Sequence, residues 1–324
     1  MPSPTEPTNA PFFIIGAGRS GTTLLRLLLA GHSRLHIPAE TWFLRPLVRE
    51  LPLTGVLTPA QLERAVAIMT GDDRWPDMDM PTEDFRRSAA RLAAPRLADI
   101  VSIVYHWQSA LAGKPRCGDK TPVYFSIVPQ LAVLYPGARF IHLIRDGRDV
   151  AVSRIDVGWE RYYERDRFEW NLAIDARRHY LGLPLARQVL EIRYEDLVLD
   201  PEKTVRHVCC FLGEEFEPAM LDWHSRRCLV PARERHIHRK LGQELSSAFV
   251  AAWNRRLSAP ECFAVEACLH ERLELLGYPL RFSGPRWRPL LRLGRGVLHA
   301  SAPWLARGSR ALKRNHLLPK RLCV

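Results

Sequence analysis

The sequence predicts an α/β fold, a P-loop-like three-layer sandwich in which helices flank a central parallel sheet. A short apolar run, FFII at residues 12–15, is followed by a glycine-containing loop and a leucine-rich helix. Two later segments, near residues 140–153 and 189–212, repeat the order of strand and helix. Alternating strands and helices are typical of parallel sheets, which bind ligands at the carboxyl ends of their strands.

Between about residues 44 and 114 the pattern is helical, and we predict a helical insertion there. Thr58 followed by Pro59 is typical of a helix start. Thr82 is a second predicted N-cap, because acidic residues follow it where negative charge suits the helix dipole. This insertion is expected to cover the sheet.

The loop GAGRSGTT at residues 16–23 has the form of an anion-binding site. A compact loop before a helix directs backbone N–H groups and the positive end of the helix dipole toward one point. A cation and several hydroxyls lie within it. A tight strand-to-helix turn with incidental glycines is the alternative interpretation. The predicted phosphate-binding residues are Arg19, Ser20, Gly21, Thr22 and Thr23.

This loop lacks the lysine of a nucleotide triphosphatase. Thr22 stands where that lysine would reach the terminal phosphates. The strand FIHLI ends in Arg145 before Asp146, although a kinase needs a metal-binding carboxylate at such a strand end. The residues therefore favour a ligand neutralised by arginine, and no metal site is predicted. A P-loop kinase and a non-catalytic nucleotide-binding module are the alternative functions.

The overall composition is that of a globular protein. The chain has 324 residues, of which 47% are hydrophobic, and no apolar stretch approaches the ~20 residues of a membrane span. The first residues, MPSPTEPTN, lack the charged start and apolar core of a signal peptide. We therefore expect a cytoplasmic protein. Seven cysteines without CxxC spacing predict neither a disulfide framework nor a zinc site.

The net charge of +12 is concentrated in a C-terminal tail. Residues 285–324 contain ten Lys or Arg and no Asp or Glu, which leaves +2 for residues 1–284. This distribution argues against nucleic-acid binding by the body of the chain. The tail alternates basic and apolar residues, which fits contact with the inner face of a membrane or with an acidic carrier protein, a helix packed on the body, or a disordered segment. We expect one domain at residues 10–284, with this tail after it.

Two motifs resemble those of the sulfotransferases that use 3′-phosphoadenosine 5′-phosphosulfate (PAPS). RSGTTLL at residues 19–25 resembles their 5′-phosphosulfate loop, and IRDGRDVAVS at residues 144–153 resembles their 3′-phosphate motif. GDKTP at 118–122 and RYEDLVLDP at 193–201 are also similar to that family. The resemblance covers about residues 12–280. It implies metal-independent transfer of a sulfuryl group from PAPS to a hydroxyl or amine acceptor.

The sequence is more similar to protein-tyrosine sulfotransferases and their bacterial relatives than to the cytosolic phenol and steroid enzymes. This similarity implies that Glu40 is the general base and that Lys120 is also catalytic. We expect Lys120 and Arg19 together to stabilise charge on the departing oxygen. Ala39 departs from the family, which has a first Glu there. A surface carboxylate and an ordinary turn residue are the alternatives for Glu40 and Lys120. Cofactor contacts are further implied for Arg145, Ser153, Tyr194 and Lys240.

The acceptor is not specified by the sequence. The region after Glu40 carries aromatic residues that fit either an apolar acceptor pocket or the core of a helical subdomain, namely Trp42, Phe43, Trp75, Phe85 and Trp107. A small molecule, a glycan, a lipid and a peptide are all compatible acceptors.

Overall fold

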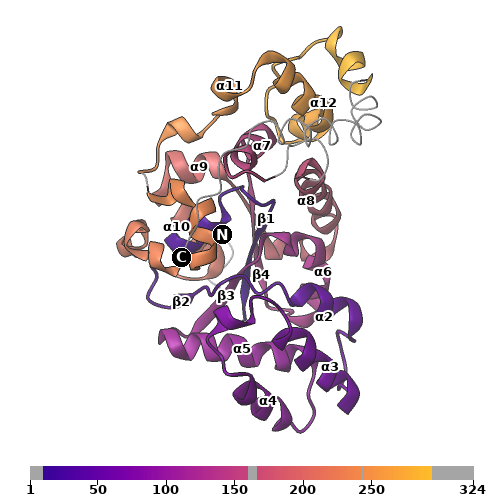
Figure 1. Cartoon of the computed structure of the whole chain (residues 1–324), viewed down its shortest axis with the longest axis vertical. Helices are drawn as coiled ribbons and strands as arrows, with labels where there is room; N and C mark the ends of the chain where they lie inside the picture. The colour runs from indigo at the N-terminus through magenta and orange to yellow at the C-terminus, as the bar shows by residue number, and fades with distance from the viewer. Residues whose placement is uncertain (1–9, 160–165, 243, 294–324) are drawn as a thin grey trace, which may run out of the picture. The chain divides into compact units, whose positions relative to one another are not determined.

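A computed structural model describes residues 10–159, 166–242 and 244–293, without the side chains of residues 166–168 and 239–240 (Figure 1). The chain forms two compact units. The first consists of Met1–Arg145 and Leu172–Val250, and the second consists of Asp146–Asn171 and Ala251–Val324.

The first unit is built on a five-stranded sheet with the order β2-β3-β1-β4-β5 (Figure 1). All of its strand pairs are parallel. This arrangement confirms the predicted α/β class with a central parallel sheet. The strands are β1 Phe12–Gly16, β2 Leu35–His36, β3 Arg116–Lys120, β4 Arg139–Ile144 and β5 Val189–Arg193.

Alternate residues of the central strands face different layers, as strand geometry requires. Phe12 and Ile14 of β1 pack in an apolar cluster with the leucines of α1 and with residues of α9 and α10. Phe13 instead stacks on Phe140, with ring centroids 5.4 Å apart, and lies near Tyr135. Both faces of the sheet are therefore buried under other elements. The helices of this unit outside the insertion are α1 Thr22–Leu29, α6 Val128–Leu134, α9 Tyr194–Leu199 and α10 Pro201–Leu212.

Short 3₁₀ segments connect these elements. They are η2 Pro122–Ile127, η3 Pro184–Gln188, η4 Pro218–Leu221, η5 His224–Leu229, η6 Ala232–Ile237, η7 Arg239–Gly242 and η8 Ser247–Phe249.

The segment between β2 and β3 is mostly helical. It contains α2 Leu44–Glu50, α3 Pro59–Thr70, η1 Trp75–Met78, α4 Thr82–Ala90 and α5 Leu97–Ala112. Thr58 caps α3 in a capping box with Gln61, as its sequence predicts. The predicted cap at Thr82 is wrong, because α4 begins at Thr82 and the Thr82 hydroxyl accepts a hydrogen bond from the Trp75 indole instead.

Three of the aromatic residues in this region belong to a core rather than to a pocket. Phe43, Trp75 and Phe85 are all buried, and the rings of Trp75 and Phe85 lie 5.0 Å apart. For these three residues the packing favours the core of a helical subdomain over an acceptor pocket. Their aromatic surface is buried in the helical segment and is not free to contact an acceptor.

The second unit, as far as it is described, is helical. It contains α7 Gly147–Asp156, α11 Trp253–Arg256, α12 Ala259–Leu275 and the first part of α8 Asp166–Leu181. The buried Arg148 forms ion pairs with Asp146 and Glu266, at 2.7 and 2.6 Å, and covers the Trp253 ring. This arginine therefore has a packing role within the unit.

Only the beginning of the predicted basic tail is described. Residues 287–293 are helical, and residues 294–324 lie outside the described part of the chain. The boundaries at 10–284 and 285–324, and the membrane or carrier-protein contact of the tail, stay predictions.

The loop between β1 and α1 depends on glycine. Gly21 is the N-cap of α1 and has a φ of 101°, and no side chain caps the helix. A Cβ atom at Gly21 would lie 2.3 Å from the Tyr194 ring, and one at Gly16 would lie 2.5 Å from the Leu143 carbonyl oxygen. The loop is therefore held against β4 and α9 by contacts that only glycine allows.

We expect Gly21→Ala to destabilise the protein more than Gly55→Ala. Both glycines have positive φ, but the space around Gly55 is open, whereas Gly21 packs on Tyr194. Gly55→Ala should cost about 1 kcal/mol for the left-handed backbone, and Gly21→Ala about 2–4 kcal/mol because overpacking is added. Urea unfolding of the two variants measures the difference. Equal losses would show that the Tyr194 contact does not restrain the loop.

Candidate active site

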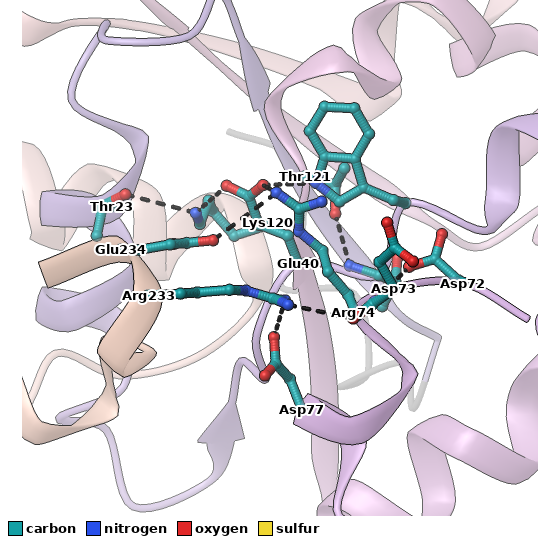
Figure 2. A network of polar contacts seen from close by, with 12 residues as sticks. Thr23, Glu40, Asp72, Asp73, Arg74, Asp77, Lys120, Thr121, Arg233 and Glu234 are labelled. Carbon is teal, nitrogen blue, oxygen red and sulfur yellow. Dashed lines mark hydrogen bonds and ion pairs between the residues drawn. The ribbon is translucent and has the colours of Figure 1, made fainter. Parts of the chain in front are cut away.

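The strand order brings three predicted site residues together. Lys120 is the last residue of β3, and Ile14 of β1 is its neighbour in the sheet. Parallel strands end at one edge, so the loop after β2, which carries Glu40, and the loop after β1 lie at the same edge as Lys120. Lys120 Nζ lies 2.5 Å from Glu40 Oε1 and 3.4 Å from Thr23 Oγ1 (Figure 2). Neither surface exposure of Glu40 nor an ordinary turn at Lys120 fits this geometry.

Glu40 has two further partners that the sequence did not suggest. The Trp42 indole N–H donates a hydrogen bond of 2.7 Å to Glu40 Oε2, and Arg74 Nη2 lies 4.0 Å from the same oxygen. The guanidinium of Arg74 also covers the Trp42 ring at 4.5 Å. Trp42 has a φ of 47°, which is unusual for a bulky residue, and this backbone places its indole against the carboxylate.

These partners determine the charge of Glu40. Burial by itself raises the pKa of a carboxyl group, but the Lys120 ammonium lies next to it, and Lys120 and Trp42 both donate hydrogen bonds. The net effect is a pKa of Glu40 below its ordinary value of 4.5. The carboxylate is therefore ionised at neutral pH and able to accept a proton.

Asp119 anchors the two segments that carry Glu40 and Lys120. Its carboxylate accepts hydrogen bonds from the hydroxyls of Thr41, Tyr105 and Thr121, at 2.7, 2.8 and 2.8 Å. Thr41 follows Glu40 in the chain, and Asp119 precedes Lys120. One buried carboxylate thus fixes the loop after β2 to the end of β3. Burial raises the pKa of Asp119 to about 6 in spite of these hydrogen bonds.

A set of ion pairs joins the helical segment to η6. Arg74 lies 4.0 Å from Glu234 as well as from Glu40, and Arg233 forms an ion pair with Asp77 (Figure 2). Arg233 also donates a hydrogen bond to the Asp73 carbonyl oxygen. No local pattern predicts the contacts of Arg74 and Arg233 across to the other segment, because the two residues of each pair lie more than a hundred positions apart.

Arg19 is directed toward the last residue of η6 and the residue that follows it. Its φ is 74°, and its guanidinium donates a hydrogen bond of 2.8 Å to the Ile237 carbonyl oxygen and lies 3.5 Å from His238 Nδ1. His238 also lies 3.5 Å from Thr23 Oγ1. Burial, Arg19 and Lys120 lower the pKa of His238 to about 3, so this imidazole is neutral near neutral pH. The role of Arg19 in stabilising the departing oxygen stays a prediction.

Arg145 and Tyr194 lie together beside the same loop. The guanidinium of Arg145 donates to the carbonyl oxygens of Arg19 and Phe249, at 3.1 and 3.0 Å, and covers the Tyr194 ring at 4.0 Å. Tyr194 in turn contacts Gly21. Two residues with an implied cofactor role are therefore coupled to residues 16–23, the predicted phosphate-binding loop, which is called the phosphate loop below.

The other predicted cofactor contacts have different positions. Ser20 and Thr22 are buried within the loop and the start of α1. Ser153 is buried in α7 of the second unit. The side chain of Lys240 lies outside the described residues.

The described part of the chain holds no cluster of three or more His, Cys, Asp or Glu side chains able to bind a metal ion. Within the same described ranges, no helix combines the length and apolarity needed to cross a membrane.

The fold and the site define an α/β protein in which a glycine-containing loop after the first strand lies next to a buried carboxylate and lysine. A family model described as "Sulfotransferase family" matches residues 11–218, and the chain belongs to this family. The resemblance predicted from the two phosphate motifs is thereby confirmed.

Two relatives show how far the similarity extends along the chain. Protein-tyrosine sulfotransferase 1 of Danio rerio is 31% identical over 215 residues, which cover 64% of this chain and 54% of the relative. An uncharacterized protein of Aquifex aeolicus is 26% identical over 235 residues, which cover 68% of this chain and 28% of that protein. The chain thus spans about half, or less, of the length of these relatives.

Among solved structures, the sulfotransferase domain of the Synechococcus PCC 7002 olefin synthase is similar to this chain. The two share 26% sequence identity with a TM-score of 0.60, over 86% of this chain and 98% of that domain.

We expect Asp119→Ala to lower the free energy of unfolding by about 3 kcal/mol, because each buried hydroxyl left without its acceptor costs about 1–3 kcal/mol. Asp73→Ala, at an exposed carboxylate, is the matched control and should change stability by less than about 0.5 kcal/mol.

The contribution of Asp119 to the free energy of unfolding also depends on pH. The folded pKa of about 6 exceeds the ordinary 3.8, so stability falls as pH rises through this window. Wild type should therefore lose stability relative to Asp119→Asn between about pH 4 and pH 7. Urea unfolding at several pH values measures this, and a flat difference would contradict the assigned shift.

Proposed function

We propose that this chain transfers the sulfuryl group of PAPS to a hydroxyl, or an amine, of an acceptor. The observation that carries the proposal is the position of Lys120, whose ammonium contacts both the Glu40 carboxylate and Thr23 of the phosphate loop. A cation placed between a base and an anion site is the arrangement that in-line group transfer needs. Membership of the sulfotransferase family supports the same chemistry.

The residues of the site fit a doubly phosphorylated nucleotide. Gly21 leaves the first turn of α1 without a side-chain cap, so its backbone N–H groups suit an anionic oxygen. We assign the 5′-phosphosulfate to this loop and the 3′-phosphate to Arg145 and Ser153, with Tyr194 near the nucleotide. When bound, PAPS supplies an activated sulfuryl group with a nucleotide leaving group.

The acceptor reaction follows from the charges at the site. Glu40 takes the proton of the acceptor hydroxyl, the acceptor oxygen bonds to sulfur, and the bond from sulfur to the 5′-phosphate oxygen breaks. The electron pair of that bond goes to the 5′-phosphate. Proton uptake neutralises Glu40, so Lys120 loses its counter-charge as negative charge develops on the leaving oxygen. Lys120, together with Arg19, then stabilises that oxygen.

Positioning and electrostatics can account for such a reaction. Sulfuryl transfer resembles phosphoryl transfer, in which the protein aligns the groups in line and stabilises charge. The sulfuryl group carries less negative charge than a phosphoryl group, so arginine, lysine and loop N–H groups suffice without a divalent ion.

We expect wild-type protein to add a sulfo group to one or more members of a panel of hydroxylated acceptors, with PAPS as donor and EDTA present. Glu40→Gln should lower this transfer about a hundredfold or more, since it removes the general base. Glu83→Gln is a matched control at an exposed carboxylate and should be as active as wild type. Mass spectrometry of the acceptors and of the released adenosine 3′,5′-bisphosphate measures both quantities. Full activity of Glu40→Gln would refute the role of Glu40. Sulfuryl transfer would be refuted if the acceptors were phosphorylated with ATP and magnesium but gained no sulfo group from PAPS.

A further inference from the structure

A cavity of about 420 Å³ lies in the first unit, in the segment that includes η5, η6 and η7. A volume of this size suits a small molecule rather than a folded partner. The lining residues are Arg227, Cys228, Val230, Arg235, His238 and Leu241.

One wall of this cavity contacts the phosphate loop. His238 lines the cavity and lies 3.5 Å from both Arg19 Nη1 and Thr23 Oγ1. Thr23 is the residue that Lys120 also contacts. A molecule in the cavity would therefore lie one side chain away from the groups assigned to sulfuryl transfer.

The cavity lining is positively charged. Arg227 and Arg235 are both exposed, and among the described residues neither forms an ion pair with Asp or Glu. Arg235 donates only its Nε to the Val230 carbonyl oxygen, at 3.2 Å. The nearest acidic neighbour in the chain, Glu234, is instead directed toward Arg74 and His238, at 4.0 Å from each.

The same lining offers apolar surface. Val230 and Leu241 contribute aliphatic side chains next to the arginines. Small-molecule sites typically combine apolar walls with a few charged or polar groups that fix orientation. Guanidinium groups match carboxylate and phosphate oxygens with paired hydrogen bonds.

We propose that this cavity binds the acceptor, and that the acceptor is a small hydroxylated molecule with an apolar body and an anionic oxygen group, a carboxylate or a phosphate. The anionic group pairs with Arg227 and Arg235, and the apolar body packs on Val230 and Leu241. This inference rests on the proposed sulfuryl transfer, because it assigns the acceptor side of the same site.

The test uses two pairs of matched probes, one phenolic and one aliphatic. Each pair consists of a hydroxylated carboxylate and its primary amide. Calorimetry measures their binding to the full chain, with and without saturating adenosine 3′,5′-bisphosphate. We expect wild type to bind each carboxylate at least about tenfold more tightly than its amide. A phosphate monoester of each probe, compared with the carboxylate, identifies which anionic group the arginines prefer.

The double variant Arg227→Gln, Arg235→Gln should lose this preference and keep its affinity for the bisphosphate. Arg226→Gln is the matched control, because Arg226 donates to the Asp222 and Ala219 carbonyl oxygens and does not line the cavity. It should keep the preference. Raised salt should weaken carboxylate binding in wild type, since the arginines are exposed.

Two results would overturn the inference. Equal binding of acids and amides by wild type would show that the cavity does not select anions. Weaker bisphosphate binding by the double variant would show that the arginines serve the nucleotide. Failure of the proposed sulfuryl transfer gives a different result from failure of this inference. In the first case wild type would bind no adenosine 3′,5′-bisphosphate, whereas the preference for carboxylates over amides is also measured in the absence of the bisphosphate.

Discussion

The buried ion pair between Lys120 and Glu40 is the interaction on which the rest of the site depends. Lys120 is fully buried at the end of β3, and a buried ammonium is costly unless a counter-charge and hydrogen-bond partners surround it. Glu40 and Thr23 provide those partners from the loop after β2 and from α1. Asp119 makes this geometry rigid, since three hydroxyls converge on its carboxylate. The residues assigned to proton transfer and charge stabilisation are thus held by strand ends.

A second set of contacts connects the phosphate loop to the side chains assigned to nucleotide binding. Gly21 allows Tyr194 to lie directly on the loop, and Arg145 covers Tyr194 while donating to the Arg19 carbonyl oxygen. Arg19 itself donates to the Ile237 carbonyl oxygen, and the adjacent His238 lies 3.5 Å from Thr23 Oγ1. The loop therefore touches both the groups assigned to the nucleotide and the segment that lines the proposed acceptor cavity. A change in any of these contacts would be transmitted to the loop backbone.

The sequence predicted the elements with a regular pattern and missed those stabilised by distant charges. The apolar strands β1 and β4 and the glycine loop were identifiable locally, because burial and backbone conformation select their residues. Strand β3, RCGDK, lacks the apolar run that predicts β1 and β4, and remote residues compensate its charges. Arg116, for example, is buried against Glu214 and the Leu212 carbonyl oxygen. Family resemblance indicated Glu40 and Lys120, whereas Trp42, Arg74 and Glu234 required the three-dimensional structure.

The central claim is that arginine, lysine and backbone N–H groups neutralise the nucleotide without a metal ion. Calorimetric titration of wild-type protein with adenosine 3′,5′-bisphosphate in EDTA tests it most directly, with ATP as the comparison ligand. Our account predicts saturable binding of the bisphosphate in the absence of any divalent ion, and weaker binding of ATP. Tight uptake of ATP that requires magnesium, together with no uptake of the bisphosphate, would contradict it.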